Sequence, residues 1–171
     1  FNIGDKDKLV AGINYRTSKA RSDAQYFRTT PENEQNYTAF YFNNEYKFLE
    51  NLKWIFGGRF DKYNKPDKSI FSPQSIIFYK PDEDQTIRLI YSQAIRAPFI
   101  ADIMMDLQFS NGFTSDQKWA PLLKLSPNNS LEPVTIKSYE IGYSKIFTKQ
   151  LNMNLNVYHY ITEDLIGYQA T

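Results

Sequence analysis

The chain has 171 residues, with 20 basic and 19 acidic side chains and no cysteine. This length fits about one domain, the near-neutral charge offers no basic face for a nucleic acid, and the missing cysteines exclude a disulfide scaffold, a zinc-finger framework and thiol catalysis. No apolar run approaches the ~18 residues that a spanning helix needs, yet aromatic residues make up 16% of the chain.

Seven segments alternate apolar and polar residues with a period of two, which predicts strands with one apolar face. The last is the clearest, because Leu151, Met153 and Leu155 alternate with Asn152 and Asn154. In chain order the seven predicted strands span residues 8–17, 36–48, 52–63, 71–80, 85–97, 136–147 and 151–164.

The connections between these segments alternate in length. Those at 49–51, 81–84 and 148–150 are short, and those at 18–35, 64–70 and 98–135 are longer. Outer-membrane barrels have this pattern, because their periplasmic turns are short and their external loops are long. The sequence therefore predicts an all-β, antiparallel up-and-down meander of about seven strands, with the short turns at one end.

The apolar face of these segments has features of a lipid-facing surface. The segments are slightly longer than the 9–11 residues of a spanning strand, and aromatic residues such as Tyr15, Trp54 and Tyr79 gather toward segment ends. Aromatic girdles at the two membrane interfaces would place them there. The alternative is that they are ordinary cross-strand aromatics of a soluble sheet.

Two stretches are more specific than this pattern. Residues 86–98 read TIRLIYSQAIRAP, and residues 128–143 read NNSLEPVTIKSYEIGY. In this order, and with the strand LKWIFGGRFD at 52–61, they resemble the barrel of TonB-dependent outer-membrane receptors. Ile95 stands where that family usually has an aromatic residue, and Val134 interrupts its usual charged run. The resemblance covers nearly the whole chain.

This resemblance implies a transmembrane β-barrel of about 22 strands with a plugged lumen. Residues 1–171 would then be an internal fragment of the barrel domain, without the plug domain. An open sheet of seven strands supports the fragment interpretation, because it would leave two unpaired edges in lipid.

The resemblance also implies a function. The whole protein would be an active transporter in the cell outer membrane of a Gram-negative bacterium, importing a small-molecule substrate such as a siderophore–iron complex, cobalamin or a glycan. Its partners would be outer-membrane lipid, the plug domain of the same full-length chain, and a TonB-type energy-coupling protein that acts through the plug.

The sequence contains no convincing catalytic constellation. His159 is the only histidine, which excludes His-based metal clusters, and no base accompanies the scattered serines. We interpret His159 as an interface residue, with a ligand or proton relay as the alternative. We expect no enzyme activity, no resident metal and no cofactor.

Seven charged residues share the parity of the polar face, among them Arg16, Glu45 and Asp61. Together they are candidates for contact with the plug, and the alternative is that they solvate the lumen wall. Four of the seven are the candidate site residues. They are Arg59, Arg88, Arg96 and Glu140.

The connection at 98–135 is the candidate for substrate capture, because long loops are usually functional or disordered. It shows no strand character, and residues 99–107 could form helical turns with Ile100, Ile103, Met104 and Leu107 on one face. Its aromatic and basic residues could stack on a ring or attract an anion, although they could instead pack against neighbouring loops. The candidate substrate-binding residues are Phe109, Phe113, Lys118, Trp119 and Lys124.

Two other classes of protein remain open at this point. One is a small self-contained outer-membrane barrel with a structural or adhesive role, which would need an eighth strand from the two termini. The other is a soluble β-sheet binding module, which would need a closed apolar core between two sheets.

Overall fold

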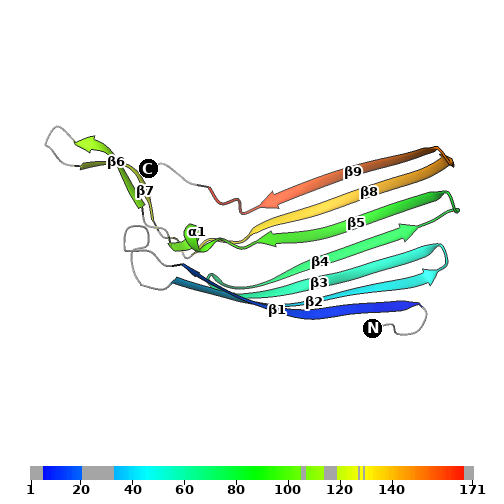
Figure 1. Ribbon diagram of the computed structural model, residues 1–171, viewed down its shortest axis with the longest axis horizontal. Coiled ribbons are helices and arrows are strands. Elements are labelled where there is room, and N and C mark those ends of the chain that lie inside the picture. The colour runs from blue at the N-terminus through cyan, green and yellow to red at the C-terminus, as the bar shows by residue number, and fades with distance from the viewer. Residues whose placement is uncertain are drawn as a thin grey trace.

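Most of the chain forms one antiparallel sheet (Figure 1). The computed structural model describes residues 6–20, 33–104, 107–113, 119–126, 128 and 130–167. The sheet has seven strands in the order β1-β2-β3-β4-β5-β8-β9, and every neighbouring pair is antiparallel. The strands are β1 (Asp7–Ala20), β2 (Asn33–Leu49), β3 (Leu52–Asn64), β4 (Asp67–Tyr79), β5 (Gln85–Arg96), β8 (Val134–Thr148) and β9 (Leu151–Glu163). The predicted all-β meander is confirmed.

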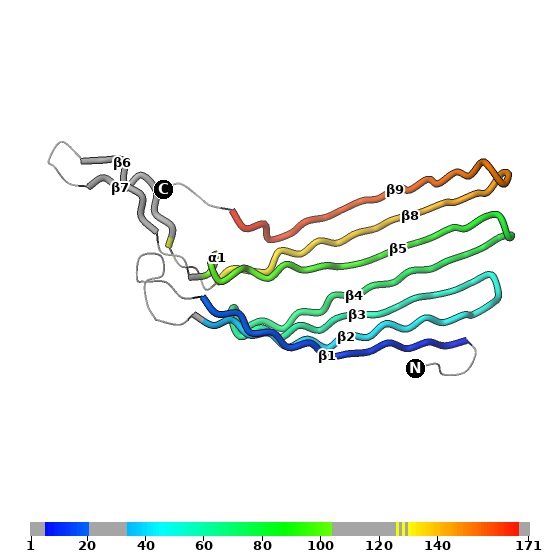
Figure 2. Tube along the Cα trace, viewed as in Figure 1, coloured from blue at the N-terminus to red at the C-terminus, as the bar shows by residue number. Residues whose placement is uncertain are grey.

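The two ends of the sheet carry different connections (Figure 2). The short turns after β2, β4 and β8 lie together at one end, which we call the turn end. The connections after β1, β3 and β5 leave from the opposite end, which we call the loop end. This is the predicted sorting of connections.

One predicted connection length is wrong. The segment at 64–70 is not a loop, because β3 and β4 are joined by Lys65 and Pro66 alone, and Asn64 pairs with Asp67. Residues 67–70 are polar enough to read as a loop. They nevertheless continue the pairing of β4 with β3, because a strand that extends beyond the apolar part of the sheet can present polar side chains to water.

The connection between β5 and β8 contains secondary structure that the sequence interpretation lacked. It includes helix α1 (Ile100–Met104) and a separate hairpin of β6 (Leu107–Phe113) and β7 (Trp119–Leu125). The expected absence of strand character was therefore wrong. The expected helical face was also wrong in part, because α1 ends at Met104 and Leu107 begins β6. Leu107 and Phe109 alternate with Gln108 and Ser110, a period that fits a strand.

The strand register sorts the side chains onto two faces, because directly paired residues of neighbouring strands point to the same side. We call the two sides the apolar face and the polar face. One continuous row of paired residues defines the apolar face: Tyr46, Trp54, Ile77, Leu89, Ile141 and Val157. The next row toward the turn end defines the polar face: Lys47, Lys53, Phe78, Arg88, Gly142 and Asn156.

No second layer covers the apolar face in the described part of the chain. Leu89 is 45% exposed and Ile141 is 57% exposed, although both are on interior strands of the sheet. The buried apolar side chains of the described residues, prolines aside, are Ala39, Ile103 and Val134. A soluble sheet of this size would bury such a face in a core. The closed core required of a soluble β-sheet module is therefore not found among these residues.

An aromatic cluster lies on the apolar face near the turn end. The Trp54 ring centroid is 6.1 Å from that of Phe48 and 4.4 Å from that of Phe56, and Phe48 is 4.8 Å from Tyr46. Trp54 Nε1 donates a hydrogen bond to Ser75 Oγ at 2.9 Å. Amphipathic rings gathered at one level of a sheet are typical of an interfacial aromatic girdle.

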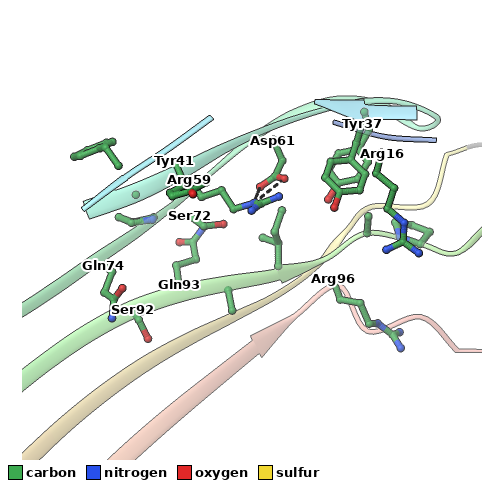
Figure 3. Close-up of a pocket in the computed structure, with 18 of the residues that line it drawn as sticks. Arg16, Tyr37, Tyr41, Arg59, Asp61, Ser72, Gln74, Ser92, Gln93 and Arg96 are labelled. Carbon is green, nitrogen blue, oxygen red and sulfur yellow. Dashed lines mark hydrogen bonds and ion pairs between the residues drawn. The ribbon is translucent and has the colours of Figure 1, made fainter. Parts of the chain in front are cut away.

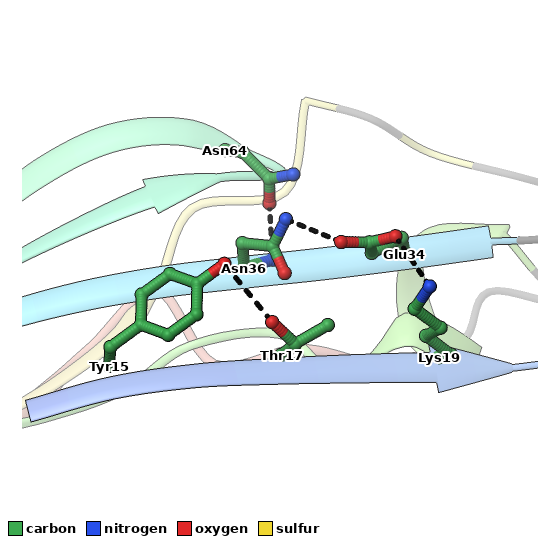
Figure 4. A network of polar contacts seen from close by, with 6 residues as sticks. All are labelled: Tyr15, Thr17, Lys19, Glu34, Asn36 and Asn64. Atoms are coloured by element: carbon green, nitrogen blue, oxygen red, sulfur yellow. Dashed lines mark hydrogen bonds and ion pairs between the residues drawn. The ribbon is translucent and has the colours of Figure 1, made fainter.

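Polar side chains replace apolar ones on the same face at the loop end (Figure 4). Lys19 Nζ lies 3.2 Å from Glu34 Oε2, and Asn36 Nδ2 donates to Glu34 Oε1 at 2.7 Å. Lys62 pairs with Asp67, and Lys137 with Glu163, at the same end. The apolar band therefore stops before the ends of the strands, where pairs of oppositely charged side chains take its place. No described helix has the length and apolar character to cross a membrane.

Candidate binding site on the polar face

A hollow of about 740 Å³ lies on the polar face at the loop end (Figure 3). Residues of β1 to β5 line it together with Ala97, Pro98 and Phe99, so this face is concave across five strands. Alternation explains the charged residues of the lining, because Arg16, Arg59, Asp61 and Arg96 all have the parity of the polar face. Its principal polar and aromatic residues are Arg16, Gln35, Tyr37, Tyr41, Arg59, Asp61, Tyr63, Ser72, Gln74, Ser92 and Arg96.

The lining of this hollow is positively charged. Among the described residues it contains Arg16, Arg59 and Arg96 and one carboxylate, Asp61. Arg59 Nε donates to both oxygens of Asp61 at 2.9 Å. Asp61 is only 3% exposed, whereas the Arg59 side chain is 37% exposed. Arg59 thus compensates the buried carboxylate, and Arg16 and Arg96 supply charge that no acidic residue described in the lining neutralises.

Aromatic rings support these cations. The Arg59 guanidinium lies 5.9 Å from the Tyr37 ring centroid, and Tyr37 packs on Tyr63 at 5.3 Å. Arg96 lies 5.8 Å from the Phe99 ring centroid. Cation–π contacts hold a guanidinium without using its hydrogen-bond donors. The arrangement is suited to an anionic ligand that can also contact aromatic surfaces.

The segment 97–104 forms a roof over part of the polar face. It leaves β5, and its helix α1 packs against β2, three strands away in the sheet. Pro98 and Ile103 are almost fully buried. Gln35 Nε2 on β2 donates to Pro98 O at 3.1 Å and to Lys65 O at 2.6 Å. One side chain therefore attaches the roof to the β3–β4 turn.

Local hydrogen bonds shape the roof. Asp102 Oδ2 accepts from the Phe99 backbone N–H at 3.0 Å, and the Asn128 N–H donates to Ile103 O at 3.0 Å. The first bond resembles a capping-box return to the start of a helix. The second ties the end of the β5–β8 connection to α1. The first bond is internal to the roof and the second connects its helix to residue 128 of the same connection.

A second polar cluster lies on the same face toward the turn end. Arg88 Nη2 donates to Asn156 Oδ1 at 3.0 Å and lies 3.8 Å from Glu140 Oε1. Arg88 Nε is buried and has no hydrogen-bond partner among the described residues. Gly142 lies between Arg88 and Asn156 in the register, and its missing side chain gives the guanidinium room to cross β8.

The candidate residues of the polar face fall into two places. Arg59 and Arg96 line the hollow, whereas Arg88 and Glu140 form the second cluster. Their expected contact with a plug stays a prediction.

The candidate residues of the long connection lie in or beside the β6–β7 hairpin. Phe109 and Phe113 belong to β6, and Trp119 and Lys124 belong to β7. Lys118, and the side chains of the other four, lie outside the described residues. Capture of a substrate by these residues stays a prediction.

Sequence reasoning missed Gln35 for an identifiable reason. The predicted strand began at residue 36, but β2 begins at Asn33 and Gln35 has the parity of the polar face. Tyr37 and Tyr63 have that parity too, so alternation alone could have placed them beside Arg59. In the described ranges no three His, Cys, Asp or Glu residues gather as metal ligands would.

Comparisons with known proteins agree with this architecture. The family model "TonB dependent receptor-like, beta-barrel" matches residues 1–171. A search of curated protein sequences finds no significant match.

Three solved receptors are similar in fold. The siderophore receptor PirA of Acinetobacter baumannii has a TM-score of 0.72 and 17% identity over 93% of this chain and 25% of its own. A mutant ferric enterobactin receptor, PfeA, of Pseudomonas aeruginosa has a TM-score of 0.75 and 13% identity over 94% of this chain and 24% of its own. PirA of Pseudomonas aeruginosa has a TM-score of 0.71 and 16% identity over 89% of this chain and 28% of its own.

The chain thus spans about a quarter of the length of these receptors. At such identities the structural likeness shows the fold, and the family model shows the membership. The open seven-stranded meander, its uncovered apolar face and the full-length family match agree, and the chain belongs to the TonB-dependent receptor β-barrel family.

Proposed function

We propose that this chain forms part of the wall of an outer-membrane receptor that imports an anionic siderophore–iron complex into a Gram-negative bacterium. The family match supports the receptor class, and the similar solved structures are described as siderophore and ferric enterobactin receptors. In this proposal the apolar face contacts outer-membrane lipid, the polar face lines the lumen, and the loop end faces outward.

The observation that supports an anionic substrate most directly is the arginine-lined hollow. Arg16, Arg59 and Arg96 line a space whose one carboxylate in the described part of the chain, Asp61, is already bound to Arg59. Guanidinium groups bind oxyanions through charge-assisted hydrogen bonds. A low-dielectric concave wall strengthens the field of such groups and raises the local concentration of anions.

Cobalamin and glycans are the alternative substrates. A neutral glycan would be held by stacking and hydrogen bonds, and it would gain little from three arginines. The aromatic residues Tyr37, Tyr63 and Phe99 could stack on either alternative. The identity of the substrate therefore rests on the charge of the hollow, which a binding experiment can test.

The partners follow from the same proposal. A plug domain of the full-length chain would occupy the lumen, where Arg88 and Glu140 are available for contact. A TonB-type protein would act on that plug and supply the energy for import. The hairpin residues Phe109, Phe113, Lys118, Trp119 and Lys124 would make the first contact with substrate outside the cell.

Ligand binding to the purified full-length receptor tests the substrate class. The double variant Arg16→Gln/Arg96→Gln removes two positive charges and leaves the Arg59–Asp61 pair intact. We expect affinity for a ferric siderophore panel to fall about tenfold or more, with binding of cobalamin and neutral oligosaccharides remaining undetectable.

The matched control is Lys62→Gln, which removes a positive charge from the opposite face of β3. It should leave affinity unchanged. Unchanged siderophore affinity in the double variant would reject the hollow as the anion site. Tight binding of a neutral glycan or of cobalamin by the unmodified receptor would reject the substrate class.

A further inference from the structure

We propose a second anion-binding site on the polar face at the turn end, formed by Lys47, Lys53 and Lys80. Its ligand would be a carboxylate or phosphate group of an anionic solute inside the lumen. The existence of this site does not depend on the proposed function. Its role in transport does depend on the proposed function, because that role assumes an anionic substrate that enters at the loop end and reaches the lysines later.

The register places two of these lysines directly opposite each other. Lys47 on β2 pairs with Lys53 on β3, and both have the parity of the polar face. Like charges directly opposite on one face destabilise a sheet. An anion bound between the two ammonium groups would turn this repulsion into a net attraction.

The acidic residues nearby compensate only one of the three lysines. Lys53 Nζ lies 3.3 Å from Glu45 Oε1 and 4.9 Å from the Phe78 ring centroid. The ammonium groups of Lys47 and Lys80 have no carboxylate within ion-pair distance in the part of the chain that the structure describes. Both side chains are exposed. Two cations therefore remain available to a ligand.

These side chains surround a defined hollow of about 410 Å³. Phe78 and Thr86 line it from the neighbouring strands, and the turn after β2 contributes Glu50, the only carboxylate of the lining among residues that the structure describes. Because Lys53 is paired with Glu45, the lining keeps two further lysines, Lys47 and Lys80, against Glu50, and is positive by one charge. The hollow is large enough for a carboxylate- or phosphate-sized group with its water.

The positive charge continues along the same row of the register. Beyond Phe78 the row reaches Arg88, whose Nη2 lies 3.8 Å from Glu140 and whose buried Nε has no partner among the described residues. Lys47, Lys53 and Arg88 therefore cross β2 to β5 at one level of the wall. Arg88 therefore adds a positive charge to the wall beside the lysine hollow.

The lysine site is separate from the arginine hollow. Lys53 and Arg59 are on the same strand and the same face, six residues apart, which corresponds to about 20 Å along a strand. One small anionic group cannot occupy both sites. An anionic substrate would therefore meet the arginines first and the lysines second, and the lysines would favour its movement away from the loop end.

Lysine acetylation footprinting of the full-length receptor tests the site. Inorganic pyrophosphate is the probe, and mass spectrometry measures the modification rate of each lysine. We expect pyrophosphate to slow modification of Lys47 and Lys53 severalfold. Lys149, an exposed lysine of the β8–β9 turn outside the hollow, is the control and should react at the same rate. Equal rates at Lys47 with and without pyrophosphate would overturn the proposal.

A second outcome would also overturn it. If Lys47 and Lys53 are already protected without the probe and pyrophosphate adds nothing, a carboxylate of the receptor itself covers them. The double variant Lys47→Gln/Lys80→Gln provides the functional comparison. It should lower the rate of uptake while leaving surface affinity for substrate unchanged, whereas Lys149→Gln should change neither. If pyrophosphate protects the lysines but the receptor binds no siderophore, the lysine site stands and the proposed substrate is rejected.

Discussion

Arg88 crosses the strand next to its own because residue 142 is a glycine. A Cβ atom at Gly142 would lie 3.0 Å from both Arg88 Nε and Nη2, and 2.8 Å from Asn156 Oδ1. Arg88 can therefore extend from β5 over β8 to the amide of Asn156 on β9. A single missing side chain thus links three strands through one guanidinium.

This relationship predicts the effect of Gly142→Ala. The added methyl group should displace Arg88 and break its hydrogen bond to Asn156, with a loss of stability of about 1 kcal/mol. Thermal unfolding of the full-length protein in detergent measures the loss. Gly167→Ala is the control, because a Cβ at Gly167 would meet nothing within 4 Å. Equal stability of the two variants would show that Arg88 moves aside at no cost.

Two neighbouring positions on β9 separate the two faces of the sheet. Leu155 is on the apolar face and pairs with Tyr143, while Asn154 is on the polar face and pairs with Ser144. If the apolar face meets lipid, Leu155→Arg should cost about 2–4 kcal/mol near mid-membrane, whereas Asn154→Arg should cost little. A denaturant titration of the full barrel in lipid distinguishes them. Equal tolerance of both substitutions would reject the lipid-facing assignment.

Gln35 should control how firmly the roof is attached. Gln35→Ala removes the donor to Pro98 O and Lys65 O, and one buried acceptor then lacks its partner. We expect faster amide hydrogen exchange in residues 99–104, with the rates in β3 unchanged. Gln93→Ala is a matched control, because Gln93 Nε2 also donates to a backbone carbonyl, that of Phe71 at 3.2 Å. If amide exchange in residues 99–104 stays slow in Gln35→Ala, the burial of Ile103 is sufficient to hold the roof in place.

Two carboxylates at the loop end predict a loss of stability in acid. Hydrogen bonds from Asn36 and then Lys19 hold the pKa of Glu34 below its ordinary value, and a hydrogen bond from Lys62 lowers the pKa of Asp67. Because these folded-state pKa values are depressed, the stabilisation is complete above the unfolded-state values and is lost as the pH falls through the folded-state values.

The corresponding experiment compares denaturation midpoints of the unmodified protein and of Lys62→Gln between neutral and acidic pH. The stability of Lys62→Gln should fall less than that of the unmodified protein below about pH 4, because the pKa of Asp67 is then nearer its ordinary value. Parallel pH profiles for the two proteins would contradict the role of this pair.

Deletion of residues 106–126 tests the external connection. The deletion removes the β6–β7 hairpin, which pairs only with itself among the described strands, and leaves the seven-stranded sheet intact. We expect a folded barrel on a heat-modifiability gel and weaker substrate binding and uptake. Unchanged affinity with an intact barrel would assign the hairpin to packing and leave binding to the polar face and other loops.

The period of two was enough to predict the seven strands of the large sheet and their faces from the sequence, but not the β6–β7 hairpin. Each of Trp54, Arg59 and Glu140 lies on the face that alternation assigned to it. Alternation is a local property, because successive side chains of any extended strand point to opposite sides. Alternation therefore places Arg59 and Arg96 on the same face, but it does not place them at the same end of that face.

Tertiary structure decided which residues of that face meet. Gln35 reaches Pro98 across 63 positions of the chain, and α1 packs on a strand that is three strands from β5. Lys47 faces Lys53 because of the register of one hairpin, in which the pairing shifts between Lys47 and Leu49. A shift of one residue would put either lysine on the other face. Alternation assigns a face to each residue, whereas turn geometry and long-range packing set the register, and the register determines which charges share a site.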